Sequence, residues 1–296
     1  LGSKTYYKSN VNQIKIVSMH KINLQVEHQT RLQEQLKSQQ SIIFILGIAT
    51  RSGTNFFEDL ICLHPNCTKS NLREVGFLRQ SKELLEFSQT MHRSWLKQPW
   101  GQKFIAKMQE MNLSTLELLN QSLGEGLIFF LKKTAYWEKI SEAEEALSLT
   151  KKTLVVKNPS VKNLKFFPMF FPKAKLVVVV RDGRAVTESQ VKSFGRNFES
   201  SIRDWNKAAQ TILDFTSNHS PSTYILVKYE DLYQNTRHEI ERILNFLELD
   251  SSTYDFERAI NLPFRGSSQS KQQDGSIVWE KQPKESVSFD PLARWK

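Results

Sequence analysis

The sequence predicts an α/β protein, a single domain with a central parallel β-sheet flanked by helices. Two observations support this fold class. Short continuous apolar runs predict buried strands, and they occupy residues 42–46, 154–157, 176–180 and 224–227. Runs without polar alternation are typical of parallel strands that helices cover on both faces. Stretches with helical periodicity separate the runs, so strands and helices alternate along the chain.

Length and composition limit the classes of protein. The chain has 296 residues, 39% of them hydrophobic, which is enough to bury one large core. Its net charge of +10 predicts that it meets an anion. The two cysteines, Cys62 and Cys67, are too few for a disulfide framework and lack metal-binding spacing, so reduced thiols are expected. We see neither a membrane-length apolar run nor a signal segment, and we expect a cytoplasmic protein.

The first 40 residues differ from the rest in composition. They are rich in lysine and glutamine, with six Lys or Arg against two Glu. We interpret residues 1–40 as a basic N-terminal arm, with a helix over 22–37, and residues 41–296 as the domain. The arm could mediate a homodimer.

The first predicted strand leads into a polar loop. Arg51, Ser52, Gly53, Thr54 and Asn55 follow it, and the residues after Thr54 have helical character. Backbone N–H groups at a helix N-terminus bind phosphate or sulfate, and an arginine adds a planar charged fork. The loop lacks the Gly-Lys-Ser/Thr of a nucleoside triphosphate site. A plain arginine-containing turn remains an alternative.

A second polar cluster follows the most apolar run. Arg181 stands at the end of the strand, and Ser189 lies eight residues later in an early turn of the next helix. The two side chains can converge on one anion. The alternative is a capped turn in which Asp182 caps the helix and Arg184 is solvated.

The other two strands also end in polar residues. Lys157, Asn158 and Pro159 end one of them, and Tyr229 follows the last. Ligands of open parallel sheets bind beyond the carboxyl ends of the strands. Four polar clusters at such ends therefore predict one shared anion site.

The interval from Phe56 to Lys152 is expected to hold several helices and a lid over a substrate. Its aromatic residues could line an acceptor pocket or belong to the core, and they include Trp95, Trp100, Tyr136 and Trp137. Two capping boxes predict helix starts, Ser141 with Glu144 and Thr236 with Glu239.

Taken together, the motifs resemble those of a known family. They read RSGTN, KNP, VRDGRAVTES, SIRDWNKAAQTI, VKYEDL and PFRGSSQS…VWEKQP…LARW, in this order from Ser41 to the C-terminus. This set resembles the sulfotransferases that use 3′-phosphoadenosine 5′-phosphosulfate (PAPS). It is most similar to the branch of tyrosylprotein and bacterial small-molecule sulfotransferases. The resemblance implies a P-loop NTPase-like sulfotransferase fold.

The resemblance also implies how a sulfate donor binds. The loop of Arg51, Ser52, Gly53, Thr54 and Asn55 would hold the 5′-phosphosulfate of PAPS without a metal ion. The 3′-phosphate would be held by Arg181 and Ser189. Further donor contacts are implied for Tyr229, Ser267, Ser268 and Lys281. The product would be adenosine 3′,5′-bisphosphate (PAP).

The catalytic roles follow from where charge develops during transfer. Negative charge grows on the leaving nucleotide, so fixed cations there lower the barrier. Lys157 and Arg51 are the candidates, and the resemblance adds Ser268. Glu74 falls where the tyrosylprotein branch places its catalytic base. His92 is the alternative base, since other branches use histidine.

The expected acceptor is the hydroxyl or amine of a small molecule, such as a specialised metabolite in natural product biosynthesis. A tyrosylprotein or carbohydrate sulfotransferase is the alternative. Two other classes stay open, a P-loop kinase or NTPase and a polyanion-binding protein. We expect neither a nucleic acid nor a membrane as a partner, because the sequence contains no recognised nucleic-acid module and no membrane-length apolar run.

Overall fold

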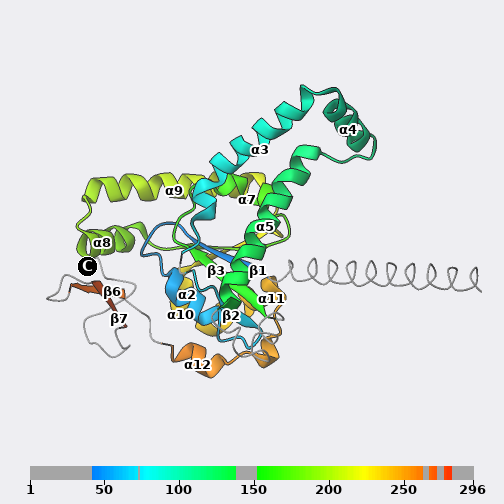
Figure 1. Ribbon diagram of the computed structural model, residues 1–296. Helices are drawn as coiled ribbons and strands as arrows, with labels where there is room; N and C mark the ends of the chain where they lie inside the picture. The colour runs from blue at the N-terminus through cyan, green and yellow to red at the C-terminus, as the bar shows by residue number, and fades with distance from the viewer. Residues whose placement is uncertain (1–41, 73, 138–151, 263–266, 272–276, 282–296) are drawn as a thin grey trace, which may run out of the picture. The chain divides into compact units, whose positions relative to one another are not determined.

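The computed structural model describes residues 42–72, 74–137, 152–262, 267–271 and 277–281. Five parallel strands form its main sheet in the order β2-β3-β1-β4-β5 (Figure 1). They are β1 (Ile42–Gly47), β2 (Cys67–Lys69), β3 (Thr153–Asn158), β4 (Lys175–Val180) and β5 (Tyr224–Lys228). The predicted parallel sheet is confirmed, and all four predicted strands are present. Their carboxyl ends meet at one edge.

The edge strand β2 was not predicted from the sequence. It has only three residues, Cys67, Thr68 and Lys69, and only the first is buried. It pairs with β3 from Cys67 opposite Thr153 to Lys69 opposite Val155. A segment this short carries no apolar run, so its strand conformation depends on the neighbouring strand.

Helices cover both faces of the sheet, as expected. One face packs against α2 (Thr54–Ile61), α10 (Tyr229–Gln234) and α11 (Thr236–Leu247). The other packs against α5 (Thr115–Trp137), α7 (Phe167–Phe170) and α9 (Phe198–Asn218). Successive residues of a strand point to opposite faces. In β1, Ile43 and Ile45 therefore enter the first core, while Phe44 and Leu46 enter the second.

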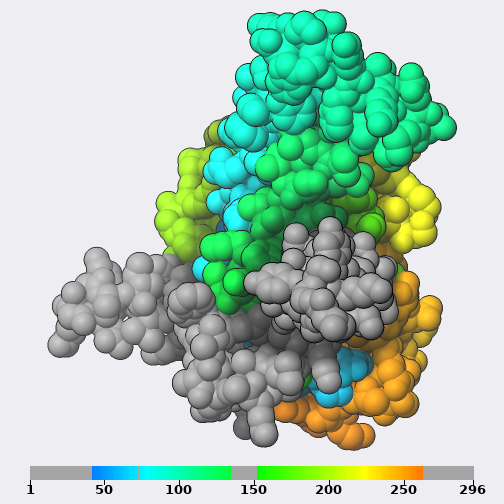
Figure 2. All heavy atoms as spheres, turned by 45° about the vertical axis from the view of Figure 1, so that its right-hand side comes forward, coloured from blue at the N-terminus to red at the C-terminus, as the bar shows by residue number. Residues whose placement is uncertain are grey.

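The interval between β2 and β3 contains several helices, as predicted. They are η1 (Gly76–Gln80), α3 (Ser81–Leu96), α4 (Pro99–Glu110) and α5. The three α-helices contact one another, and α5 also contacts α7. Figure 2 shows α4 at the top of the view, with the adjoining ends of α3 and α5. None of the described helices is long and apolar enough to cross a membrane.

The remaining elements connect or follow the strands. These are η2 (Leu164–Phe166), α8 (Gly183–Phe194), η3 (Ser251–Thr253), α12 (Phe256–Ile260), β6 (Ser267–Lys271) and β7 (Ile277–Lys281). The last two form an antiparallel pair, with Ser267 opposite Lys281 and Ser268 opposite Glu280. The side chains of this pair lie outside the described residues.

The capping box predicted at the start of α11 is wrong. The hydroxyl of Thr236 donates instead to the carbonyl of Leu232, at 2.9 Å. The carboxylate of Glu239 accepts from Arg242 at 2.7 Å rather than from the N-cap, Asn235. The preceding helix α10 supplies the carbonyl of Leu232 because α10 ends just before Asn235, whereas Arg242 belongs to α11 itself. The other predicted capping box and the N-terminal arm with its helix lie outside the described residues.

Candidate active site

The loop between β1 and α2 turns back on the end of its own strand. The hydroxyl of Ser52, fully buried, donates to the carbonyl of Ala49 at 2.7 Å. A side-chain carbon on Gly47 would lie only 2.3 Å from that hydroxyl oxygen. Arg51 adopts a positive φ of 76°, which is uncommon for a residue with a side chain. The loop is thus held in one compact shape, with Arg51 placed by a strained backbone.

Gly53 lets this loop approach an aromatic ring. Its φ is 93°, and an added side-chain carbon would lie 2.5 Å from the ring of Tyr229. Gly53 is also the N-cap of α2. The first N–H groups of a helix have no partner within it and attract anions together with the helix dipole. Thr54 is buried in this first turn and Asn55 is exposed.

Four of the residues predicted to bind the donor form one cluster. Nε of Arg51 donates to the hydroxyl of Ser189 at 2.8 Å. Nη1 of Arg181 donates to the carbonyl of Arg51 at 3.1 Å, and its guanidinium lies 4.2 Å from the centre of the Tyr229 ring. The strand ends of β1, β4 and β5 therefore bring these side chains together, as the sequence predicted.

Burial strengthens the electrostatics of this cluster. Arg181 is 5% exposed, and Ser189 and Tyr229 are almost fully buried. An arginine keeps its charge in such a place, and a charge interacts more strongly where water is excluded. The cluster therefore favours an anion with oxygen atoms on more than one side.

Two residues that sequence reasoning missed hold the cluster in place. The amide of Gln190 donates to the carbonyl of Thr50 at 3.0 Å and lies 3.1 Å from its hydroxyl. The indole of Trp205 donates to the carbonyl of Arg181 at 3.2 Å. Gln190 is the neighbour of Ser189, and Trp205 belongs to a quoted motif to which no role was given. Their places in the sequence, beside Ser189 and within the motif SIRDWNKAAQTI, were the signals that could have identified them.

The helix-cap alternative at Asp182 is also present. Its carboxylate accepts from the backbone N–H of Arg184 at 2.8 Å and pairs with the Arg184 guanidinium. The hydrogen bond from the Arg184 guanidinium holds the pKa of the Asp182 carboxyl below its ordinary value. Asp182 thus caps α8, while the neighbouring Arg181 contacts Arg51 and Tyr229.

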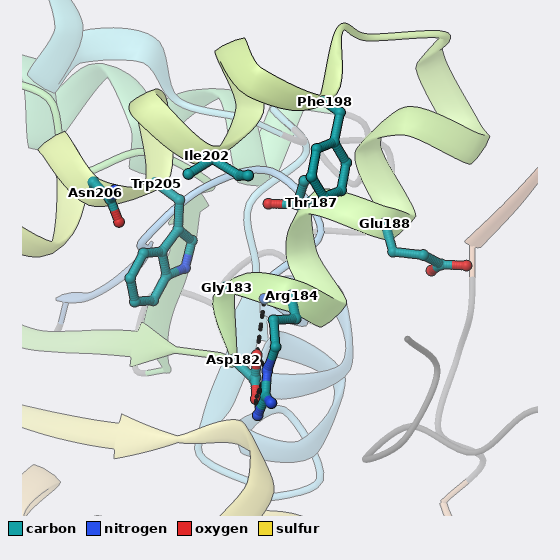
Figure 3. A pocket seen from close by; sticks show the side chains of 9 residues that line it. All are labelled: Asp182, Gly183, Arg184, Thr187, Glu188, Phe198, Ile202, Trp205 and Asn206. Carbon is teal, nitrogen blue, oxygen red and sulfur yellow. Dashed lines mark hydrogen bonds and ion pairs between the residues drawn. The ribbon is translucent and has the colours of Figure 1, made fainter. Parts of the chain in front are cut away.

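A pocket of about 510 Å³ lies between α8 and α9. Figure 3 shows Phe198, Ile202 and Trp205 projecting from α9 toward α8. Asp182 and Arg184 close one end of it. The pocket is lined by none of the residues predicted to bind the donor or to catalyse. It adjoins them through the turn after Arg181, through Glu188 beside Ser189, and through Trp205, which bonds to Arg181.

The two main catalytic candidates form a second pair. Nζ of Lys157 lies 3.9 Å from a carboxylate oxygen of Glu74. The lysine side chain is 7% exposed and that of Glu74 is 53% exposed. The backbone N–H of Val75 donates to the carbonyl of Lys157, which fixes this approach. A buried amine beside an accessible carboxylate can stabilise a leaving oxygen and accept a proton.

The histidines differ in their surroundings. The ring of His64 is buried and accepts from the N–H of Asn66, and its Nε2 lies 3.1 Å from the carbonyl of Asp250. These contacts make His64 a structural residue. His92 lies on α3 and contacts the ring of Trp95. Within the described residues, no hydrogen bond or ion pair joins His92 to Glu74 or Lys157. Ser267, Ser268 and Lys281 keep their predicted roles as predictions.

Comparison with known proteins identifies relatives. A model described as the sulfotransferase family matches residues 42–253. The protein-tyrosine sulfotransferase of Drosophila melanogaster is 23% identical over 75% of this chain and 41% of its own length. Protein-tyrosine sulfotransferase A of Caenorhabditis elegans is 25% identical over 46% of this chain and 36% of its own. The chain thus spans less than half of the length of these curated relatives.

Solved structures with a similar arrangement were also found. The sulfotransferase domain of the Synechococcus PCC 7002 olefin synthase has a TM-score of 0.46 and 20% identity, over 86% of each chain. The sulfotransferase domain from the curacin biosynthetic pathway has a TM-score of 0.44 and 21% identity, over 71% of this chain and 74% of that one.

Proposed function

Because the chain belongs to the sulfotransferase family, we propose that it moves a sulfuryl group from PAPS to an acceptor hydroxyl or amine and releases PAP. The convergence of Arg51, Arg181 and Ser189 is the observation that carries this proposal. It joins the loop after β1 to the helix after β4 in one buried, positively charged cluster.

The residues present fit a nucleotide with phosphates at two positions. Arg181 and Ser189 offer a charged donor and a hydroxyl to the 3′-phosphate. The N–H groups at the start of α2, with Ser52, Thr54 and Asn55, offer neutral donors to the 5′-phosphosulfate. The ring of Tyr229 lies close to both sets, because it approaches Gly53 and lies under the Arg181 guanidinium. Two adjoining donor sets suit a ligand with phosphate groups at two positions better than they suit a single phosphate ion.

The chain's own residues then divide the chemistry. The bound donor supplies the sulfuryl group and a leaving phosphate. Lys157 and Arg51 hold positive charge where the leaving oxygen becomes negative, which lowers the barrier more than it tightens binding. A carboxylate oxygen of Glu74 accepts the proton of the acceptor hydroxyl as the new oxygen–sulfur bond forms.

Titration calorimetry with adenosine 3′,5′-bisphosphate tests the donor site. We expect tight binding, compared with ATP and magnesium in parallel. If ATP with magnesium bound and the bisphosphate did not, the result would favour a kinase or NTPase instead. Weak binding of every nucleotide, with an affinity for polyanions that falls steeply as salt rises, would favour the polyanion-binding protein.

Lys157→Met tests the transition-state role separately. We expect the variant to bind the bisphosphate as tightly as the unmodified chain and to lose turnover by roughly 100-fold or more. Lys165→Met, which changes a lysine on η2, is the control. Loss of binding in place of turnover would assign Lys157 to ground-state recognition.

Two acceptor classes remain to be compared. The sequence alone led us to expect a small molecule. The names of the curated relatives favour a second candidate, the phenol of a protein tyrosine. A transfer assay with tyramine and with a tyrosine-containing peptide, at matched concentrations, distinguishes them. A higher kcat/KM on the peptide would support the protein acceptor, and a higher value on tyramine the small molecule.

A further inference from the structure

Apolar side chains stand exposed along one face of α4 and at its C-cap, Met111. Trp100 is 62% exposed, Phe104 50% and Met111 59%. Their spacings of four and seven residues place them along a single helical stripe. A stripe of large exposed apolar groups marks an interaction site more often than a scatter of single residues does.

Two residues of α4 are packed against the protein, which fixes the direction of this stripe. Gly101 and Ile105 are buried on a neighbouring face of the helix. A side-chain carbon on Gly101 would lie 2.1 Å from the carbonyl oxygen of Trp95, so the backbones of α3 and α4 are in close contact. Trp100 and Phe104 therefore cannot turn inward without separating the two helices.

Lysines flank the stripe. Lys103 and Lys107 are exposed on α4, and Lys97 precedes the helix. Within the described residues these three form no ion pair, whereas Lys69, Lys175 and Lys192 each have an acidic partner. Between residues 93 and 113 the chain has four basic residues and one acidic residue, Glu110. The stripe thus lies in positive potential.

We propose that this α4 surface, formed by Trp100, Lys103, Phe104, Lys107 and Met111, binds the surface of an anionic lipid bilayer. Helices that lie in a membrane interface have aromatic and apolar residues beside lysines. The aromatic rings enter the headgroup region, while the lysine amines remain at the level of the lipid phosphates. Such binding needs no membrane-spanning helix.

Two other occupants fit the observations less well. A second copy of the chain, docked face to face, would bring Lys103 and Lys107 against their own counterparts and repel. Cores of protein interfaces are depleted in lysine, while interfacial membrane helices are enriched in it. The charge around Trp100 therefore favours lipid over protein. This inference does not depend on the proposed reaction.

Vesicle sedimentation of the full chain is the direct test. Vesicles of phosphatidylcholine with phosphatidylserine should bind the protein, and vesicles of phosphatidylcholine alone should bind it much more weakly. The double variant Trp100→Ser/Phe104→Ser should lose about tenfold or more in affinity for the mixed vesicles. Lys103→Gln and Lys107→Gln should each lose about fivefold. Brominated lipids should quench tryptophan emission less in the double variant.

Matched controls separate a local surface from the overall positive charge. Phe129→Ser/Leu213→Ser removes two side chains that are 51% and 58% exposed elsewhere, and Lys207→Gln removes an exposed lysine of α9. Neither should change vesicle binding. The proposal would be overturned if the control variants lost as much vesicle affinity as the α4 variants, or if the unmodified chain did not bind anionic vesicles. A dimer in sedimentation velocity that Trp100→Ser/Phe104→Ser converts to a monomer would assign the surface to self-association. Unchanged circular dichroism and urea unfolding verify that the variants are folded.

Discussion

Nε of Arg51 lies 2.8 Å from the hydroxyl oxygen of Ser189, although 138 residues separate them in the chain. The bond joins the loop after β1 to the middle of α8. Because the hydroxyl oxygen of Ser189 accepts this bond, its own O–H can still donate to an anion. A charged acceptor would strengthen that hydrogen bond.

Arg181→Ala should weaken the binding of adenosine 3′,5′-bisphosphate by about tenfold or more, because it removes a buried charged donor. The affinity for AMP, which lacks the 3′-phosphate, should change less. Calorimetry with both nucleotides measures this difference. Arg184→Ala, in the same turn but paired with Asp182, is the control. An unchanged preference for the bisphosphate would remove Arg181 from the site.

Glu74→Gln should reduce kcat roughly 100-fold or more and leave bisphosphate binding intact, because the amide cannot accept the acceptor's proton. Glu83→Gln, an exposed glutamate of α3, should behave as the unmodified chain does. Steady-state kinetics and calorimetry on the same preparations separate the two effects. Near-normal turnover in the Glu74 variant would transfer the base to another residue.

Gly53→Ala should disturb the loop between β1 and α2. The added carbon meets the Tyr229 ring at 2.5 Å, and the φ of 93° is strained for alanine. We expect a loss of more than about 1 kcal/mol of stability together with weaker bisphosphate binding. Gly126→Ala, where nothing lies within 4 Å of the new carbon, should be neutral or stabilising. Urea unfolding of both variants shows whether the cost is specific to the loop.

Lys132→Met should change how stability depends on pH. Burial lowers the pKa of Lys132 from its ordinary value of 10.5 to about 8. Between these values the unfolded chain binds more protons than the folded one, so this lysine makes stability rise with pH. The variant should be more stable at pH 7, by about 3 kcal/mol at most, and should lose that rise. Urea unfolding from pH 7 to pH 10 measures the stability of both proteins. Equal slopes of stability against pH would contradict a lowered pKa for Lys132.

The main sheet was predictable because its central strands are continuous apolar runs. The strands β1, β3, β4 and β5 can be predicted without tertiary information, because strands buried on both faces consist almost entirely of apolar residues. The edge strand β2 has one buried residue, and its pairing with β3 supplies what its sequence lacks. The capping box at Thr236 failed for a similar reason, because the end of α10 already offers it a carbonyl.

The candidate site was predictable to the extent that strand ends define it. Arg51, Arg181 and Tyr229 follow three neighbouring strands, and the sheet brings them together. Gln190 and Trp205 could not be assigned in advance, because their bonds depend on how α8 and α9 pack against the loop. The position of Glu74 came from the family resemblance alone. Its approach to Lys157 depends on backbone pairing that no local pattern encodes.

The bonds that build the anion cluster have consequences for folding kinetics. They join residues 130, 138 and 140 positions apart, so long stretches of chain must be closed into loops before any of them forms. A fragment that ends before β4 carries the loop of Arg51 but lacks Arg181, Ser189 and Gln190. Nucleotide affinity should therefore return late during refolding, after helical content, and newly synthesised chains should acquire it only when α8 and α9 have docked.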